Sequence, residues 1–297
     1  MNPKVCLCAT ACKPQYWMPL YNSIGRNDIE FELVFVGPNP PGYELPKNFR
    51  FIKTDVKPAQ CFEIATRNTS ADFILHIADD FEFATPNPLD KLYDTYKSFN
   101  QENIIVTTKY MQNNVVLPIS VYQFFSQYNS DLVIPINSFM SKELYREIKG
   151  IDRNFEAIFW EIDIAMRVYA LGGKVVISDV YVNEDKTGEA GRDFWGRTAL
   201  KDRVLLESFW VSNGKVHLNR KNPVEPFVDL NILKYSQGPR GRWRGNGIEL
   251  FEKIEDNLNS QWSIPGRIYR AIKRPRMYFN YAKRIALSIK KMVLRQK

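Results

Sequence analysis

The chain has 297 residues, 44% of them hydrophobic and 13% aromatic, and a formal net charge of +8. This composition is ample for a packed core and excludes a wholly disordered chain. No run of about 18 apolar residues occurs, and Lys4, Lys13 and Pro14 interrupt any secretory-type leader, so we expect a cytoplasmic protein. The four cysteines form neither a disulfide framework nor two zinc-type pairs.

Apolar runs alternate with helical spacing over the first hundred residues. We expect strands at residues 5–9, 31–36, 49–53, 73–78 and 104–108, and helices at 17–24, 59–68 and 89–99. This alternation predicts an α/β fold with a mostly parallel central sheet and helices on both faces. Ligands of such sheets bind at the carboxyl ends of the strands.

The pattern is mixed after residue 110. We expect strands at 115–117, 132–136 and 174–178, a helix that begins near 141, and helices at 161–171 and 196–212. The segment 236–247 contains four Gly and three Arg and predicts a loop. Two roles stay open for this loop: a plain solvated connection, or a lid whose arginines reach phosphate.

The expected strand 73–78 ends in three carboxylates, Asp79, Asp80 and Glu82. Two adjacent carboxylates repel each other by about 1 kcal/mol in water, so folding alone gains nothing from this arrangement. Oxygen ligands suit Mn²⁺ or Mg²⁺, ions that usually bind together with substrate phosphates. The segment therefore predicts a metal site, with a solvated acidic turn as the alternative.

A second acidic pair, Glu161 and Asp163, falls in the first turn of the expected helix 161–171. The positive end of the helix dipole favours carboxylates there, so capping accounts for both. A carboxylate held near a hydroxyl group can also act as a general base. Arg167, four residues after Asp163, is expected to pair with one of these carboxylates.

Several motifs occur in the order found in one enzyme family. They are ATACK at 9–13, ATRN at 65–68, ILHIADD at 74–80, GIDRNF at 150–155 and WEIDIAMRVYALGGKV at 160–175. Together they resemble a family 2 glycosyltransferase with the GT-A, Rossmann-like fold, over about residues 4–212. Three positions depart from the family pattern: Ala78 replaces the first Asp of the DxD element, Trp160 replaces a Glu, and no His follows the strand at 174–178.

The resemblance implies a metal-dependent, hexosyltransferase-like enzyme of polysaccharide biosynthesis. It would transfer a sugar from a nucleotide-diphosphate donor, with a UDP-sugar favoured, to a saccharide or lipid-linked glycan acceptor, and would invert the anomeric centre. The alternatives are a sugar-phosphate nucleotidyltransferase and a non-catalytic carbohydrate-binding or scaffold protein of the same fold.

The resemblance also implies roles for individual residues. Glu161 would be the catalytic base, and Asp163 would orient the acceptor. The donor would contact Thr10, Ala11, Arg67, Asn68, Asp79 and Asp80. Because Ala78 supplies no carboxylate, Mn²⁺ or Mg²⁺ would rest on Asp80, helped by Asp79 or Glu82.

Three parts follow along the chain. We expect a GT-A catalytic domain at 1–235, with a nucleotide-binding half at 1–110 and an acceptor half at 111–235. A flexible loop and helix would follow at 236–265, and a basic amphipathic helical tail at 266–297.

The tail concentrates the positive charge of the chain. It holds eleven of the 41 Lys and Arg residues and no Asp or Glu, so the other 30 basic residues face all 33 acidic ones. An apolar face with flanking basic residues fits an interfacial helix on the anionic cytoplasmic face of a membrane. Packing on its own domain, or on a second subunit of a homodimer, is the alternative. No nucleic-acid-binding motif accompanies the tail, so we expect no nucleic-acid partner.

Overall fold

A computed structural model describes residues 3–54, 56–99, 103–117, 124–128, 130–184 and 196–227. The chain divides into two units, Met1–Trp243 and Arg244–Lys297, and all described residues belong to the first. The loop expected at 236–247 and the basic tail at 266–297 lie outside the described residues, so their roles and the expected domain boundaries stay predictions. Within the described ranges, no helix is long and apolar enough to cross a bilayer.

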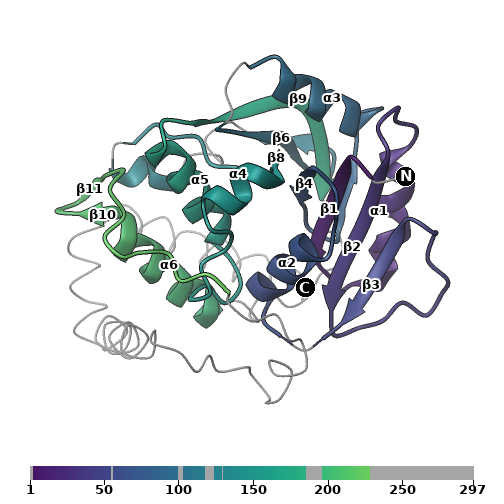
Figure 1. The fold of residues 1–297 in the computed structure, drawn as a ribbon, viewed down its shortest axis with the longest axis horizontal. Coiled ribbons are helices and arrows are strands. Elements are labelled where there is room, and N and C mark those ends of the chain that lie inside the picture. Colours follow the sequence, from purple (N-terminus) through teal and green to yellow (C-terminus); the bar gives the residue numbers. More distant parts are fainter. Residues whose placement is uncertain are drawn as a thin grey trace, which may run out of the picture. The chain divides into compact units, whose positions relative to one another are not determined.

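The expected alternation of strands and helices is confirmed (Figure 1). The strands are β1 (Val5–Thr10), β2 (Phe31–Gly37), β3 (Phe49–Lys53), β4 (Phe73–His76), β5 (Phe81–Phe83), β6 (Ile104–Gln112), β7 (Val115–Val116), β8 (Ser138–Ser141), β9 (Lys174–Glu184), β10 (Val211–Ser212) and β11 (Lys215–Val216). The helices are α1 (Trp17–Ile24), α2 (Pro58–Arg67), α3 (Pro88–Lys97), α4 (Lys142–Glu147), α5 (Trp160–Ala170) and α6 (Gly196–Trp210), with 3-10 turns η1 (Pro14–Tyr16) and η3 (Phe124–Tyr128). The protein is thus an α/β fold whose central sheet is flanked by helices.

The sheet has the strand order β3-β2-β1-β4-β8-β6-β9-β5, with β7 paired to β6. β1 runs parallel to both β2 and β4, and in this register Thr10 lies opposite Val36 and Cys8 lies opposite His76. The carboxyl ends of these three strands therefore meet at one edge of the sheet. The turn that follows β1 and the acidic segment that follows β4 leave the sheet side by side.

Helices α1 and α2 cover opposite faces of the strands β1 to β3 (Figure 1). The chain steps outward from β1 to β2 through α1, then returns from β3 past β2 and β1 to β4 through α2. Because parallel crossovers are right-handed, steps in opposite directions place their helices on opposite faces. On the α1 face, Trp17 packs on Phe35 and Phe51, with ring centroids 5.6 and 5.1 Å apart.

One expected strand is wrong, and a different segment takes its place in the sheet. Residues 132–136 form no strand, because side chains satisfy their backbone: the Tyr169 hydroxyl donates to the Val133 carbonyl, and the Ile136 N–H donates to Thr107 Oγ1. The strand instead is β8, antiparallel to β4 and β6.

Candidate active site

Asp79 clamps the turn that follows β1. The residue is 5% exposed, and its Oδ2 atom accepts hydrogen bonds from the backbone N–H groups of Cys12 and Lys13, both at 2.8 Å, and from Trp17 Nε1 at 3.0 Å. Burial raises the pKa of Asp79 above its ordinary value, although these three donors favour the anion. This oxygen is committed to the fold, because it ties the end of β4 to the turn after β1.

Asp80 forms an ion pair with the same turn. Lys13 Nζ lies 2.8 Å from Asp80 Oδ2, and 29% of the lysine side chain and 13% of the aspartate side chain are exposed. The ammonium group also lies 5.8 Å from the centroid of the Tyr16 ring. The carboxyl edge of the sheet therefore presents a partly buried pair of opposite charges to solvent.

Glu82 lies apart from this pair, on β5. It is exposed between the buried Phe81 and Phe83, because successive side chains of a strand point to opposite faces. In the described residues no three His, Cys, Asp or Glu side chains are placed to hold a metal ion. With Asp79 engaged by three N–H groups and Asp80 by an ammonium group, the structure does not gather the three-carboxylate metal site that the sequence predicts.

Thr10 and Ala11 lie beside this turn, as expected for the end of β1. The Ala11 N–H donates to the Val36 carbonyl at 2.8 Å, which extends the pairing of β1 with β2 by one residue. Gly37 follows Val36, and a Cβ atom there would come within 1.8 Å of the Ala11 carbonyl oxygen. The turn after β1 therefore needs a glycine on the neighbouring strand.

Arg67 and Asn68 lie at the other edge of the sheet, where α2 ends and β4 has not yet begun. Arg67 Nε donates to Glu63 at 2.6 Å, and its Nη2 donates to the Phe227 carbonyl at 2.6 Å. The Asn68 carbonyl accepts a hydrogen bond from Arg50, near the start of β3. The structure does not bring Arg67 and Asn68 together with Thr10, Ala11 and the aspartates.

The first turn of α5 packs on the carboxyl end of β4. The Trp160 ring lies 5.1 Å from His76, the last residue of β4, and 4.6 Å from Phe62 of α2. Phe159, just before the helix, has a φ of 68°. This left-handed value is costly for a bulky residue and is typical of functional sites. The start of α5 therefore lies at the same edge of the sheet as the turn after β1.

Glu161 has a carboxylate oxygen that can still accept a hydrogen bond. The residue is half-buried, and its Oε2 atom is buried without a hydrogen-bond partner among the described residues. Burial raises the pKa of Glu161 from 4.5 to about 7, and the charge of Asp202 acts in the same direction. A carboxylate with a free oxygen and a pKa near neutrality suits the role of a proton acceptor.

Asp202 of α6 holds the loop that leads to Glu161. Its carboxylate accepts the backbone N–H groups of Glu156 at 3.0 Å, Ala157 at 2.7 Å and Ile158 at 3.0 Å. Burial raises the pKa of Asp202 to about 7 despite these donors. The sequence analysis missed this residue, but a signal exists. Asp202 shares the helix face of the buried residues Leu205, Leu206, Phe209 and Trp210.

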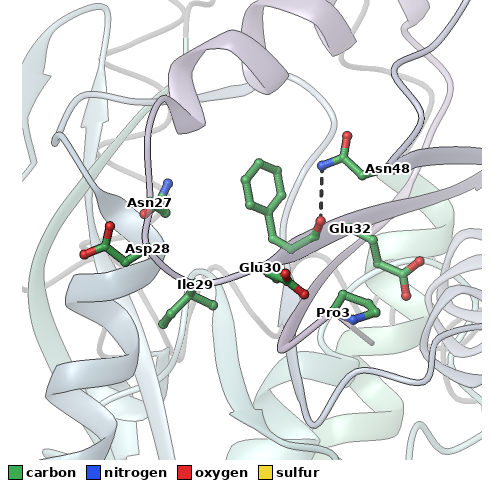
Figure 2. Close-up of a pocket in the computed structure, with 8 residues that line it drawn as sticks. Pro3, Asn27, Asp28, Ile29, Glu30, Glu32 and Asn48 are labelled. Atoms are coloured by element: carbon green, nitrogen blue, oxygen red, sulfur yellow. Dashed lines mark hydrogen bonds between the residues drawn. The ribbon is translucent and has the colours of Figure 1, made fainter. Parts of the chain in front are cut away.

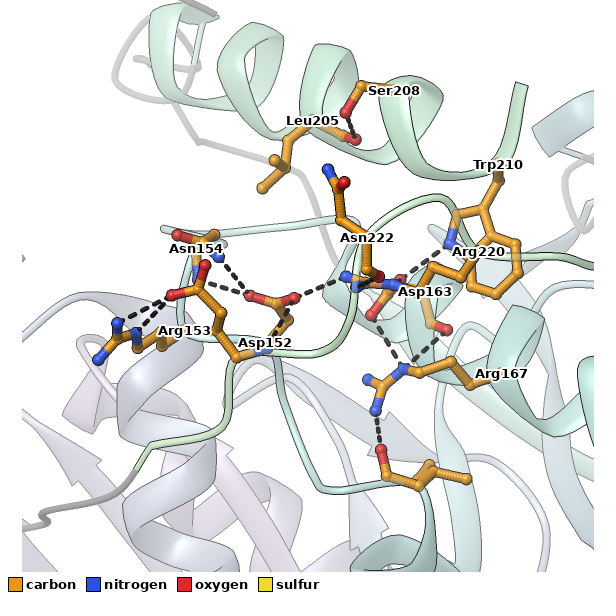
Figure 3. Close-up of polar contacts among 12 residues, drawn as sticks. Asp152, Arg153, Asn154, Asp163, Arg167, Leu205, Ser208, Trp210, Arg220 and Asn222 are labelled. Atoms are coloured by element: carbon orange, nitrogen blue, oxygen red, sulfur yellow. Dashed lines mark hydrogen bonds and ion pairs between the residues drawn. The ribbon is translucent and has the colours of Figure 1, made fainter. Parts of the chain in front are cut away.

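Asp163 lies inside a buried charge network (Figure 3). It is 0% exposed, its Oδ2 lies 3.0 Å from Arg167 Nε, and its Oδ1 accepts from Arg220 Nε at 3.0 Å and from Trp210 Nε1 at 2.8 Å. Burial opposes ionisation, but Arg167 and Arg220 outweigh it and lower the pKa of Asp163 below its ordinary value. The expected pairing of Arg167 is confirmed, and no solvent-facing surface of Asp163 remains for an acceptor.

Arg220 extends the network to Asp152. Its Nη2 lies 2.6 Å from Asp152 Oδ2, and its Cζ lies 3.8 Å from the centroid of the Phe209 ring. The sequence analysis did not find Arg220, because its partners Asp152 and Asp163 precede it by 68 and 57 residues. Contacts between residues so far apart in the sequence leave no local sequence pattern.

Two further buried side chains, one of them beside Trp160, also have polar atoms without a hydrogen-bond partner among the described residues. His76 and Ser138 are cross-strand neighbours on β4 and β8, and His76 Nδ1 and Ser138 Oγ have no hydrogen-bond partner among the described residues. Burial lowers the pKa of His76 to about 3, so the ring is neutral, and its Nε2 lies 2.9 Å from Thr66 Oγ1. Unsatisfied polar atoms thus occur near the start of α5 as well as on Glu161.

Two cavities lie at the opposite, amino edge of the sheet. One of about 510 Å³ opens between Asn27, Glu30 and Asn48, where the Asn48 amide donates to the Phe31 carbonyl at 3.1 Å (Figure 2). The other, of about 650 Å³, lies where β4 begins and β8 ends, and Lys142 is among its lining residues. Neither cavity is lined by the residues that follow β1 and β4. The candidate site is therefore identified from its side chains and not from a cavity.

Comparison with known proteins gives a limited likeness. No family model and no curated protein matches the chain. Among solved structures, the crystal structure of S. aureus TarS 1-349 matches with 12% identity and a TM-score of 0.48, over 68% of this chain and 64% of that chain. The same fragment in complex with UDP matches with 12% identity and a TM-score of 0.46, over 68% of this chain and 65% of that chain. This chain therefore spans less than two thirds of the TarS fragment.

Proposed function

We propose that this chain is a glycosyltransferase that moves a sugar from a nucleotide-diphosphate donor to a saccharide or lipid-linked acceptor. A UDP-sugar is the favoured donor, on the sequence resemblance alone. The observation that carries the proposal is the Glu161 carboxylate, with its free buried oxygen and its pKa of about 7. Its helix packs at the carboxyl edge of the sheet, where ligands of α/β sheets bind.

The proposed reaction is a single displacement. As the acceptor oxygen bonds to the anomeric carbon, Glu161 takes the hydroxyl proton, and the bond from that carbon to the diphosphate oxygen breaks. The bonding electrons leave with the diphosphate, which departs as a nucleoside diphosphate, and the anomeric centre is inverted. Asp163 supports this step indirectly, because it joins α5 to Arg220 and Trp210.

Release of nucleoside diphosphate from a panel of UDP-, GDP-, CDP- and dTDP-sugars tests the proposal. With a donor that the protein uses, Glu161→Gln should lower turnover by about 10² to 10⁴-fold, the scale of general-base catalysis, and leave nucleotide affinity within a few-fold. Glu143→Gln is the matched control, because Glu143 is also a first-turn glutamate but is exposed on α4. Normal turnover by Glu161→Gln would remove the base assignment. No release from any donor would favour a non-catalytic protein.

The pH profile gives a second, independent reading. Only the ionised carboxylate accepts a proton, so kcat/KM should rise with pH and level off above about 7, the pKa of Glu161. If the base were an ordinary glutamate, the rise in kcat/KM would instead be centred near pH 4.5. A profile that is flat between pH 5 and 8 would contradict the role of Glu161.

A further inference from the structure

The acidic end of β4 already holds a cation of its own. Lys13 Nζ lies in contact with Asp80 Oδ2, at 2.8 Å, at the carboxyl edge where the proposed donor would bind. Asp79, the other carboxylate of this segment, accepts three N–H groups with one oxygen. Asp80 is thus paired with a side-chain cation where the sequence predicts a divalent ion.

The backbone holds Lys13 firmly in this position. Its N–H donates to Asp79, its carbonyl accepts the Tyr16 N–H at 3.0 Å, and Pro14 restricts the next φ angle. Tyr43 adds a hydrogen bond to the Pro14 carbonyl. The lysine side chain therefore starts from a fixed turn, and its four-carbon stem leaves the ammonium group partly exposed.

A divalent ion and this ammonium group would share one carboxylate, that of Asp80. A metal on Asp80 would have to displace Lys13 Nζ or lie beside it, and two cations at contact distance repel each other. A lysine carries three N–H donors and binds phosphate as a point charge. Its charge can therefore attract a phosphate oxygen while it remains paired with Asp80.

We propose that Lys13 binds the diphosphate of the nucleotide donor directly, with Asp80 orienting it, so that nucleotide binding needs no divalent ion. This inference rests on the proposed glycosyltransferase function. During transfer, the same ammonium group would stabilise the negative charge that grows on the departing diphosphate. Asp80 is then a positioning residue for Lys13 rather than a metal ligand.

Calorimetric titration of the full chain with UDP, GDP, CDP and dTDP tests this, once with excess EDTA and once with MnCl₂. We expect at least one nucleotide to bind in EDTA, with a Kd within about threefold of its value in Mn²⁺. Lys13→Met should weaken this binding by at least about tenfold in EDTA, and Lys13→Arg should restore part of it. Lys47→Met, an exposed lysine before β3, is the matched control and should leave Kd unchanged.

Asp80→Asn separates the two roles of the aspartate. If Lys13 carries the diphosphate, this variant keeps most of its nucleotide binding in EDTA, because the ammonium group remains and loses only the carboxylate that orients it. If Asp80 holds a metal, the variant loses Mn²⁺-dependent binding. Binding that occurs only with Mn²⁺ would overturn the inference and leave the proposed function standing. Absence of nucleotide binding in both conditions would overturn the proposed function itself.

Discussion

Glu161 faces opposite requirements from folding and from catalysis. Its pKa is raised from 4.5 to about 7 mainly by burial, so the folded protein holds this proton more tightly than the unfolded chain does. The contribution to stability is therefore complete below about pH 4.5 and is lost as pH rises through 7. Above that pH the fold carries a buried anion, which is the form that a base needs.

Substitution of Glu161 should therefore stabilise the protein while it lowers turnover. At pH 8, we expect Glu161→Gln to raise the free energy of unfolding by roughly 1–3 kcal/mol, because the shift in pKa corresponds to about that much and glutamine has no charge to bury. At pH 5, which is only slightly above the ordinary pKa of 4.5, most of this gain should be lost. Urea unfolding at both pH values measures this.

Asp202 also has a pKa of about 7, but it does not affect this comparison. Both proteins keep Asp202, so its effect cancels when the variant and the wild type are compared at one pH. The exposed Glu143→Gln variant should show no gain at either pH. An equal stability difference at pH 5 and pH 8 would mean that Glu161 is not a buried acid.

At the scale of single elements, strand β2 and the turn after β1 make a close backbone contact at the carboxyl edge of the sheet. The turn after β1 passes so near to β2 that a Cβ atom on Gly37 would lie 1.8 Å from the Ala11 carbonyl oxygen and 2.7 Å from its carbon. Both atoms belong to the backbone, so no side-chain rotation relieves the overlap. The turn that carries Lys13 depends on this approach.

Gly37→Ala should therefore move the turn after β1. We expect a loss of about 1–3 kcal/mol in the free energy of unfolding, as for overpacking, together with weaker nucleotide binding. Thermal unfolding and calorimetric titration measure the two effects. Gly42→Ala is the matched control, because a Cβ atom added to Gly42 would have no neighbouring atom within 4 Å. If both variants behave like the wild type, the contact does not constrain the turn.

At the scale of the whole described unit, a buried network of ion pairs joins segments that are far apart in the sequence. Arg220, which follows β11, bonds Asp152 after α4 and Asp163 in α5, and both aspartates are 0% exposed. Burial raises the pKa of Asp152 although Arg220 opposes this. Loss of the arginine would leave two carboxylates buried with less compensation.

Arg220→Met should destabilise the protein by about 3–5 kcal/mol, the range for removing one partner of a buried pair. Arg153→Met is the control, because its ion pair with Glu225 has 20% and 30% of the side chains exposed and should contribute about 1 kcal/mol or less. Urea unfolding at pH 7 compares them. Equal, small losses would show that the network does not stabilise the fold.

The sequence by itself determined the elements and the edge of the sheet at which the site lies. Apolar periodicity placed β1 to β4 and α1 to α3 within a few residues of their observed bounds, because each pattern reflects local burial. It also marked Glu161, Asp79 and Asp80 as carboxylates at the ends of such elements. These are properties of neighbouring residues, which a pattern can report.

Only the tertiary structure decided what each carboxylate does, because its charge is balanced by residues far along the chain. Asp79 meets Trp17, Asp80 meets Lys13 and Asp163 meets Arg220, across 57 to 67 positions. The position of β8 was also missed, because the strand is defined by its pairing with β4, which lies far away in the sequence. Local periodicity therefore predicted the scaffold, while long-range electrostatics distinguished the free carboxylate from those that hold the fold.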